Sequence, residues 1–385
     1  MNNKRGFNGN KLKDARIYRG KSILELADEI NVTKQAISQF ENGKNTPSLN
    51  NLLELSKILK VPTSYFFEID EENVSVGNTY FRALMSSNKK DRLSQINRTK
   101  KVTLLYKILS EYLEFPKLNL IEINREKEDI ENIALKLREK WNLGLNPINN
   151  IVNLLERNGI IVSAFNTETD DIDAFSQLSS YNDEKYFCVV LGNDKNSATR
   201  RQFNTAHELG HILLHDWENN DIEEISKDEF RKMEEEANQF AAAFLLPKES
   251  FIKDLLYEKN LDFYVELKKK WKVSISAMIM RAYQLEKLNI NQYQYLMRQL
   301  AQRGWRKKEP YDEIIKMEQP TLFKKSIQML FDNNILNAKE LLDILSQNGL
   351  GLGEDEIEKL LCLEKGTLKI ENDNEIVDFI NLKRN

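Results

Sequence analysis

The histidines constrain this chain more than any other feature, because all three fall in the short segment from His207 to His215. The segment opens with His207-Glu208-Leu209-Gly210-His211. On a helix, side chains four residues apart project from one face, so His207 and His211 can bind one metal ion. Glu208 lies beside the open coordination position, where a carboxylate can take a proton from water and return it to a leaving amine. The spacing predicts a helical metal centre with Glu208 as its general base.

The third histidine, His215, lies too far along the same helix to bind that ion. Eight residues at a rise of about 1.5 Å place it roughly 12 Å from His207, whereas zinc–nitrogen bonds are about 2 Å long. The sequence between His211 and His215 contains no glycine turn of the kind that lets some zinc sites use a third histidine. We therefore expect His215 to support the site from its second layer, at the helix end.

A carboxylate from another helix is needed to complete such a metal centre. The helix predicted from residue 229 to 246 carries a face that permits close packing, formed by Ala237, Phe240, Ala241 and Phe244. Glu236 is next to that face, whereas Glu234 is expected to point more outward. We predict Glu236 as the third ligand. One divalent ion is expected, with zinc favoured and manganese left open by these residues.

The N-terminal segment reads as a basic bundle of short helices. Residues 1–60 hold 11 Lys and Arg against 6 Asp and Glu, although the whole chain has a net charge of −4. Apolar spacing predicts helices at 12–19, 23–30, 33–40 and 49–59, with the turn Asn31-Val32 between the second and third. Two helices joined in this way indicate a helix-turn-helix for double-stranded DNA, with a protein-docking bundle as the alternative.

The third of these helices is the predicted recognition helix. Thr33 can cap it, which leaves Lys34, Gln35 and Gln39 on the face that enters a major groove, where glutamine can read adenine and lysine guanine. Phosphate contacts, which position the protein without specifying sequence, are predicted for three further residues: Arg16, Asn42 and Lys44.

The rest of the chain predicts further modules. Residues 69–125 are expected to form a basic helical linker, in which the stretch from Arg82 to Lys107 either contacts phosphates or is simply solvated. Helices at 130–141 and 149–158, followed by β-like runs at 160–165, 172–178 and 186–192, predict a small sheet before the histidine helix. That helix is expected to begin near Ser197 as its N-cap. Residues 286–385 are expected to be helical. The predicted fold class is therefore mainly α: an all-α helix-turn-helix domain, an α+β domain and a helical C-terminal region.

Several segments resemble the ImmA/IrrE metallopeptidases, and they occur in the family's order: Ala174-Phe175-Ser176, then 203–215, then Glu236-Ala237-Asn238-Gln239-Phe240-Ala241. The resemblance covers residues 126–285 and implies a zincin-like peptidase that cleaves a helix-turn-helix repressor in a stress or mobile-element response. It also implies that His207, His211 and Glu236 are ligands and Glu208 the base. The oxyanion donor stays open, with Tyr181 and Tyr186 among the candidates.

The N-terminal segment, over residues 8–68, resembles the XRE family of lambda-repressor-like domains, notably in Ser38-Gln39-Phe40-Glu41-Asn42-Gly43. The combination predicts a DNA-binding metallo-endopeptidase. The alternative is an XRE-family regulator whose peptidase-like domain acts as a sensor without proteolysis, and a purely structural metal is a third reading.

Composition excludes other classes. The chain has no run of 18 apolar residues and no apolar segment after its first residues, so we expect a cytoplasmic protein without a membrane partner. Its two cysteines offer neither a disulfide framework nor a cysteine zinc site. A homodimer is left open.

Overall fold

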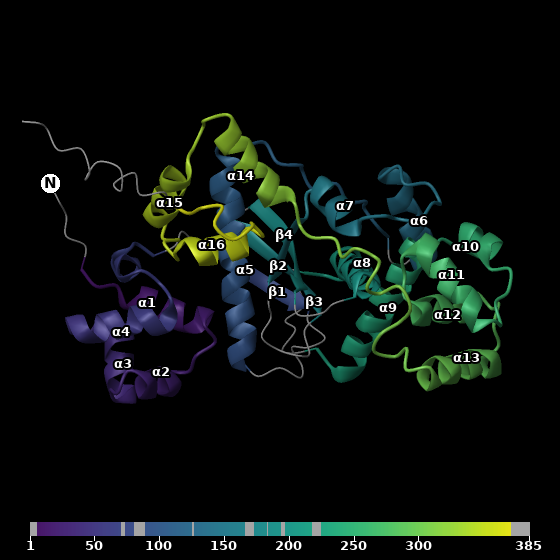
Figure 1. Ribbon diagram of the computed structural model, residues 1–385, viewed down its shortest axis with the longest axis horizontal. Helices are drawn as coiled ribbons and strands as arrows, with labels where there is room; N and C mark the ends of the chain where they lie inside the picture. Colours follow the sequence, from purple (N-terminus) through teal and green to yellow (C-terminus); the bar gives the residue numbers. More distant parts are fainter. Residues whose placement is uncertain are drawn as a thin grey trace, which may run out of the picture. The chain divides into compact units, whose positions relative to one another are not determined.

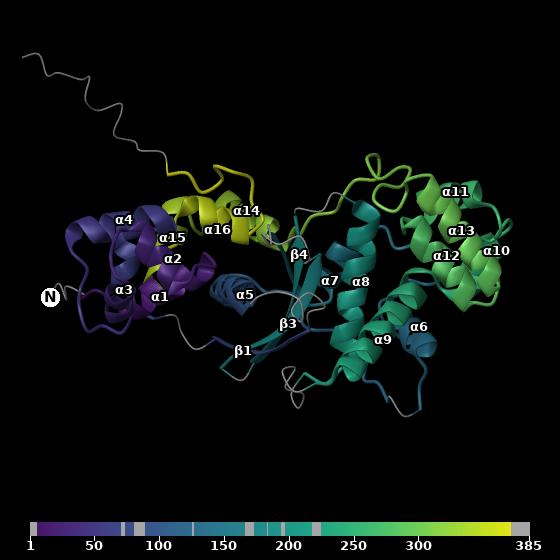
Figure 2. The same ribbon diagram turned by 90° about the horizontal axis from the view of Figure 1, so that it is seen from below.

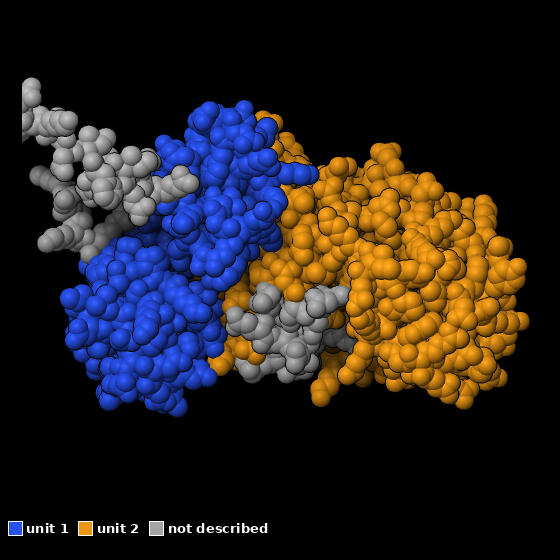
Figure 3. All heavy atoms as spheres, in the orientation of Figure 1, with its two compact units in different colours: residues 1–72, 323–385 blue, residues 73–322 orange. Residues whose placement is uncertain are grey.

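The computed structural model describes residues 6–70, 74–80, 89–124, 127–165, 173–182, 184–193, 197–217 and 225–370. The chain divides into two compact units (Figure 3), of which unit 1 comprises residues 1–72 and 323–385 and unit 2 residues 73–322. Most of the described elements are helices, and the strands form one small sheet (Figure 1). The predicted fold class is confirmed.

The sheet of unit 2 has four strands in the described part of the chain, in the order β1-β3-β4-β2. These strands are β1 (Val74–Tyr80), β2 (Ile161–Phe165), β3 (Ala174–Tyr181) and β4 (Glu184–Gly192). β3 pairs antiparallel with both β1 and β4, whereas β2 pairs parallel with β4. Three strands match the β-like runs of the sequence to within a few residues. β1 was not predicted.

Helices cover both faces of the sheet, with α5 (Lys89–Ser110) on one side and α8 (Ala198–Leu214) on the other (Figure 2). β2 is buried along its whole length, as expected for a strand covered on both faces. The remaining helices of unit 2 are α6 (Ile130–Lys140), α7 (Ile151–Arg157), α9 (Lys227–Leu245), α10 (Lys248–Asp254), α11 (Leu261–Trp271), α12 (Ile275–Gln284) and α13 (Ile290–Gln302).

From residue 73 onward, the predicted linker belongs to unit 2 instead of forming a separate connector. β1 extends the sheet, and α5 packs on it with Val102, Leu105 and Leu109 buried. Arg98 and Lys101 of the basic stretch are buried as well, so these two cations do not form a phosphate-contacting surface. The physical reason is that the sheet face opposite α8 carries Phe175, Cys188 and Val190, which α5 helps to bury. Residues 82–88 of the basic stretch lie outside the described residues.

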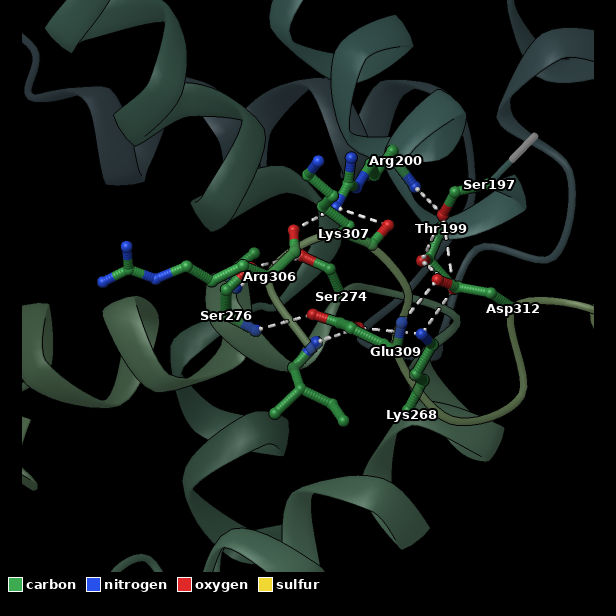
Figure 4. A network of polar contacts seen from close by, with 12 residues as sticks. Ser197, Thr199, Arg200, Lys268, Ser274, Ser276, Arg306, Lys307, Glu309 and Asp312 are labelled. Carbon is green, nitrogen blue, oxygen red and sulfur yellow. Dashed lines mark hydrogen bonds and ion pairs between the residues drawn. The ribbon is translucent and has the colours of Figure 1, made fainter. Parts of the chain in front are cut away.

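A buried polar network fixes the start of α8 (Figure 4). Ser197, the predicted N-cap of α8, accepts the backbone N–H of Arg200 and donates to Asp312 Oδ1 at 3.2 Å. Lys268 is fully buried and donates to Asp312 at 2.6 Å and to Glu309 at 2.8 Å. Glu309 also accepts the first backbone N–H groups of α12. Because Lys268 pairs with both carboxylates, this network can be buried and hold α8, α11 and α12 in register.

Unit 1 combines the N-terminal bundle with the last three helices. The bundle consists of α1 (Gly9–Tyr18), α2 (Ile23–Glu29), α3 (Lys34–Glu41), α4 (Leu49–Leu59) and the short η1 (Thr63–Phe67), and the C-terminal helices are α14 (Leu322–Asp332), α15 (Ala338–Gln347) and α16 (Glu354–Leu360). None of the described helices of either unit has the length and apolarity that a membrane crossing requires.

Buried polar contacts join the two parts of unit 1. Lys11 on α1 donates to the carbonyl of Gly349 at 2.6 Å, and Tyr18 donates to Glu356 on α16 at 2.6 Å. Glu68 accepts the hydroxyl of Ser346 at 2.6 Å and the backbone N–H of Gly351 at 3.1 Å. Residues 286–385 are therefore not one C-terminal region, because α13 belongs to unit 2 and α14–α16 pack with the N-terminal bundle.

The contact between Glu68 and Gly351 gives a test of this joint unit. A Cβ at residue 351 would lie 1.9 Å from Glu68 Oε1, so Gly351→Ala forces the buried carboxylate to move. We expect unit 1 to lose about 1–3 kcal/mol, the usual range for overpacking. All four tryptophans lie in unit 2, so circular dichroism should show an earlier transition while tryptophan fluorescence does not. Gly6→Ala is the matched control, because a Cβ there meets nothing within 4 Å. Equal unfolding curves for both variants would contradict this packing.

Candidate functional site

The site is built on a close crossing of α8 and α9. Gly210 lies at the crossing, where an added Cβ would be 3.1 Å from Ala237 Cα and 3.2 Å from its carbonyl oxygen. Only two small residues facing each other allow this approach, because any larger side chain would force the helices apart. The crossing brings the middle part of α9 against the face of α8 that carries His207 and His211.

Three side chains converge there. His207, His211 and Glu234 each offer one ligand atom, and these atoms all lie within 4.8 Å of one another. The two Nε2 atoms are 3.0 Å apart. Glu234 approaches them with both carboxylate oxygens, at 3.6 Å from His207 Nε2 and 3.3 Å from His211 Nε2.

The structure therefore corrects the expected third ligand, since Glu234 and not Glu236 joins the two histidines. Glu236 instead lies 3.3 Å from His215 Nε2. With about 100° of rotation per residue, Glu234 and Glu236 flank the packed face of α9 at about 70° and 90° on opposite sides. Asn238, one turn after Glu234 on the same flank, contacts His207. The helix sequence alone could not tell which flank faces α8.

The donor set fits a divalent cation. Both carboxylate oxygens of Glu234 are buried without a hydrogen bond of normal geometry, although they face the imidazoles. His207 Nδ1 lies 3.0 Å from Asn238 Oδ1, and an amide oxygen accepts a proton only from a ring nitrogen that carries one. The Nε2 atom of neutral His207 then presents a lone pair to the cluster. Two imidazole nitrogens and one carboxylate are the ligand types of catalytic zinc sites.

The electrostatics match this arrangement. Burial opposes the charge of Glu234, but the contacts with His207 and His211 hold its pKa below the usual range. Burial also opposes protonation of His207, yet Glu234 and the charge of Glu208 raise its pKa. The buried carboxylate and imidazoles thus form a charged cluster in which a cation would compete with protons on the histidines.

Glu208 lies on the same helix face and is 5% exposed. Burial raises its pKa, partly offset by the two histidines and by the hydroxyl of Ser176, which donates to Glu208 Oε2 at 2.6 Å. A carboxylate whose pKa is raised toward neutral pH is suited to general acid–base work. Ser176 belongs to one of the segments that carry the family resemblance, but no local pattern pairs it with Glu208. The same is true of Asn238 and His207.

The two tyrosines considered as oxyanion donors face away from this site. Tyr186 packs against Tyr106 of α5 with ring centroids 5.6 Å apart, and Lys107 of α5 lies over the ring of Tyr181. Both therefore lie on the sheet face opposite α8, and neither is suited to stabilise charge next to Glu208.

The predicted recognition helix corresponds to α3, whose cap Thr33 accepts the backbone N–H of Ala36 at 3.1 Å. Lys34 and Gln35 are exposed at its N-terminal end, and so are Asn42 and Lys44 beyond its C-terminus. Gln39 is half-buried and accepts from Asn45 at 2.8 Å. Five of the six predicted DNA contacts are thus at least partly accessible on unit 1.

Arg16 is the exception. Its guanidinium is buried, bonded to both oxygens of Glu41 at 2.5 and 2.9 Å and to the carbonyl of Lys21 at 2.8 Å. A bidentate pair of this kind fills the donors that a phosphate contact would need. Arg16 therefore joins α1 to α3 inside the bundle, and its prediction as a phosphate contact is wrong. The sequence could not reveal this because its partner is 25 residues away.

Two segments of the chain match known protein families, one in each unit. Residues 155–283 match the IrrE N-terminal-like domain, a peptidase family, and residues 12–66 match a helix-turn-helix family. The chain joins an XRE-type helix-turn-helix to an IrrE-like domain. The suspected resemblance is confirmed for both segments, and both matches lie within the predicted ranges 8–68 and 126–285. The IrrE-like domain contains β2–β4 and the converging side chains of α8 and α9.

Curated relatives match over 16% of this chain. The SPbeta prophage-derived uncharacterized HTH-type transcriptional regulator YonR of Bacillus subtilis is 36% identical over 70 residues, which is 65% of its length. Uncharacterized HTH-type transcriptional regulators of Sinorhizobium fredii and Sinorhizobium medicae are 37% and 35% identical over 60 residues, or 42% and 43% of their lengths. The chain thus spans less than two thirds of each. A crystal structure of Bacillus thuringiensis PlcR with PapR7 and DNA aligns with 92% of this chain and 96% of its own, at 12% identity and a TM-score of 0.16, too low to carry an argument.

The geometry predicts how metal retention responds to substitution. Glu234→Gln keeps the size of the side chain but removes the anionic ligand, so zinc affinity should fall at least about 100-fold, more than the loss of a residue that only supports a ligand. Glu235→Gln is the matched control, because Glu235 is exposed and pairs with Arg231 at 3.1 Å. Metal content after dialysis against a chelator measures both. Stoichiometric zinc in Glu234→Gln would contradict the cluster.

A buried and an exposed basic residue of unit 1, Arg16 and Lys34, should respond differently when each is substituted and both stability and DNA binding are measured. Arg16→Ala leaves Glu41 buried without its partner and should destabilise unit 1 by about 3–5 kcal/mol. Lys34→Ala removes an exposed charge and should leave the unfolding curve unchanged while weakening DNA binding and reducing its salt dependence. Denaturation and fluorescence anisotropy with duplex DNA distinguish these effects. An Arg16→Ala protein of wild-type stability would refute the structural role.

Proposed function

We propose that this protein is a DNA-tethered metallo-endopeptidase that cleaves a repressor or another DNA-associated protein. The single observation that carries the proposal is the convergence of His207, His211 and Glu234 beside the buried carboxylate of Glu208. The match to the IrrE N-terminal-like domain supports the same chemistry. Such cleavage would relieve the repression of genes in a stress or mobile-element response.

His207, His211 and Glu234 would hold one divalent ion, for which zinc is favoured and manganese is the alternative. When bound, such an ion acts as a Lewis acid and activates water at neutral pH. The chain's own contribution to binding is orientation. Asn238 holds the ring of His207, and the crossing at Gly210 fixes the distance between the two helices.

Glu208 carries the proton transfer in this proposal. Ser176 holds Oε2, and we assign Oε1 to accept a proton from the attacking water and to deliver it to the leaving amine. Burial raises the pKa of Glu208, which favours the protonated form that must deliver the proton in the second step. Burial of Glu208 also keeps bulk water away from the exchanged proton.

The helix-turn-helix would direct the enzyme to its substrate. The relatives are named as HTH-type transcriptional regulators, and Lys34, Gln35 and Gln39 are our candidates for base contacts, with Asn42 and Lys44 on phosphates. The DNA-contact candidates lie in unit 1 and the metal cluster in unit 2. Attachment beside a DNA-associated substrate would raise its effective concentration without new contacts at the cleavage site. The setting would be cytoplasmic.

The rival is a regulator whose IrrE-like domain senses a signal without proteolysis. A site that only binds a metal needs no additional carboxylate of raised pKa beside its ligands. Glu208 is such a carboxylate, and its burial and bond to Ser176 are difficult to explain in a sensor. These features favour the enzyme.

Cleavage is the decisive experiment. Zinc-loaded protein is incubated with helix-turn-helix repressors encoded beside its gene, and mass spectrometry identifies the fragments. We expect one cut in one repressor. Glu208→Gln should retain zinc and lose at least about 100-fold in rate, the low end of general-base contributions. Equal cleavage by wild type and Glu208→Gln would refute the assigned base. A wild-type protein that binds DNA and zinc but cuts none of the repressors would favour the sensor.

A further inference from the structure

His215 lies just beyond the end of α8 and contacts His211, one of the candidate metal ligands. The helix ends at Leu214, and His215 has extended backbone angles of φ −115° and ψ 151°. Its side chain is only 4% exposed. Trp217 donates its indole N–H to the carbonyl of His211 at 3.2 Å, which holds the chain at this exit. The ring of His215 is therefore packed against His211 instead of pointing to solvent.

The contacts of His215 define where its proton lies. Its Nε2 is 3.3 Å from Glu236 Oε2, and a carboxylate can only accept a hydrogen bond, so Nε2 carries the proton. Nδ1 of the neutral ring then has a lone pair. That atom is 2.9 Å from His211 Nδ1, which must in turn be the donor.

This order of donors determines the chemistry of His211. With its proton on Nδ1, neutral His211 presents a lone pair at Nε2, the atom that faces Glu234 and lies 3.0 Å from His207 Nε2. His207 has a separate support, the amide oxygen of Asn238. The two histidines of the cluster are thus oriented by different partners: Asn238 contacts His207 directly, whereas Glu236 acts on His211 through His215.

We propose that Glu236 and His215 are positioning residues that act in series to fix the tautomer of His211 and increase its basicity toward the metal. The proposal rests on the metal centre of the proposed function, but it concerns residues outside the ligand set. Glu236 polarises His215, and His215 accepts the His211 proton. Partners of this kind usually change metal affinity by about 10–100-fold.

A double-mutant cycle on zinc affinity tests action in series. His215→Ala should weaken zinc binding about 10–100-fold, measured by chelator competition on the full chain. Glu236→Ala should weaken it less, because His215 still accepts the His211 proton. The double variant should be no weaker than His215→Ala alone, because Glu236 acts only through His215. If the double variant loses zinc affinity by the product of the two single losses, Glu236 and His215 act independently and the proposal is wrong.

Two controls make the cycle specific. Glu235→Ala changes the adjacent, exposed carboxylate on α9 and should leave zinc affinity unchanged. Asn238→Ala removes the separate support of His207, so its loss should multiply with that of His215→Ala. A general loosening of α9 would instead lower affinity in all of these variants, including Glu235→Ala, and would contradict a positioning role.

Histidine-selective ¹⁵N NMR reads the tautomers without relying on substitution. The chain has only three histidines, so every signal belongs to this site. We expect His215 protonated on Nε2 with bare Nδ1 in the metal-free and zinc-loaded protein, and His211 protonated on Nδ1 in the zinc-loaded form. A His215 proton on Nδ1 alone would overturn the proposal. The predicted His215 tautomer in a protein that retains no zinc would support the chain of hydrogen bonds and contradict the metallopeptidase.

Discussion

The close approach of α8 to α9 is the contact on which the metal centre depends. Gly210 has no side chain, and a Cβ there would already be 3.1 Å from Ala237 Cα. Glu234 lies one turn before Ala237, so its carboxylate reaches the histidines only at this separation. A helix spacing increased by the width of a methyl group would separate the carboxylate from both imidazoles.

Much of this could be predicted from the sequence, because local patterns encode it. The spacing of His207 and His211 placed both on one helix face, and Ser197 and Thr33 were predicted as the helix caps that the structure contains. The third ligand could not be predicted in the same way. Which flank of α9 faces the histidines depends on how α8 lies across it, and that is a tertiary property. The helix sequence favours neither Glu234 nor Glu236 by more than a few tens of degrees.

Long-range pairing explains the other differences. Arg16 was predicted as an exposed phosphate contact, but its guanidinium forms an ion pair with Glu41 inside the bundle. The C-terminal helices could not be assigned to the N-terminal bundle from sequence, because contacts such as that of Tyr18 with Glu356 join residues 338 positions apart. The predicted linker failed for a similar reason, since α5 is held by a sheet formed mostly from later residues.

The unit structure also affects how the two activities could be combined. α14–α16 follow unit 2 in the sequence and pack with the helix-turn-helix, so unit 1 is formed from segments before and after unit 2. Unit 2 is in effect inserted between two parts of the DNA-binding unit. In the proposed function, the peptidase unit would therefore be joined to the DNA-binding unit by two covalent connections.

The most direct measurement for the metal centre is a crystal structure of the zinc-loaded protein with anomalous data at the zinc edge. We predict one anomalous peak, about 2.0–2.2 Å from His207 Nε2, His211 Nε2 and a carboxylate oxygen of Glu234, with Glu236 still in contact with His215. A peak bonded to Glu236 in place of Glu234, or no peak among these three side chains, would contradict it.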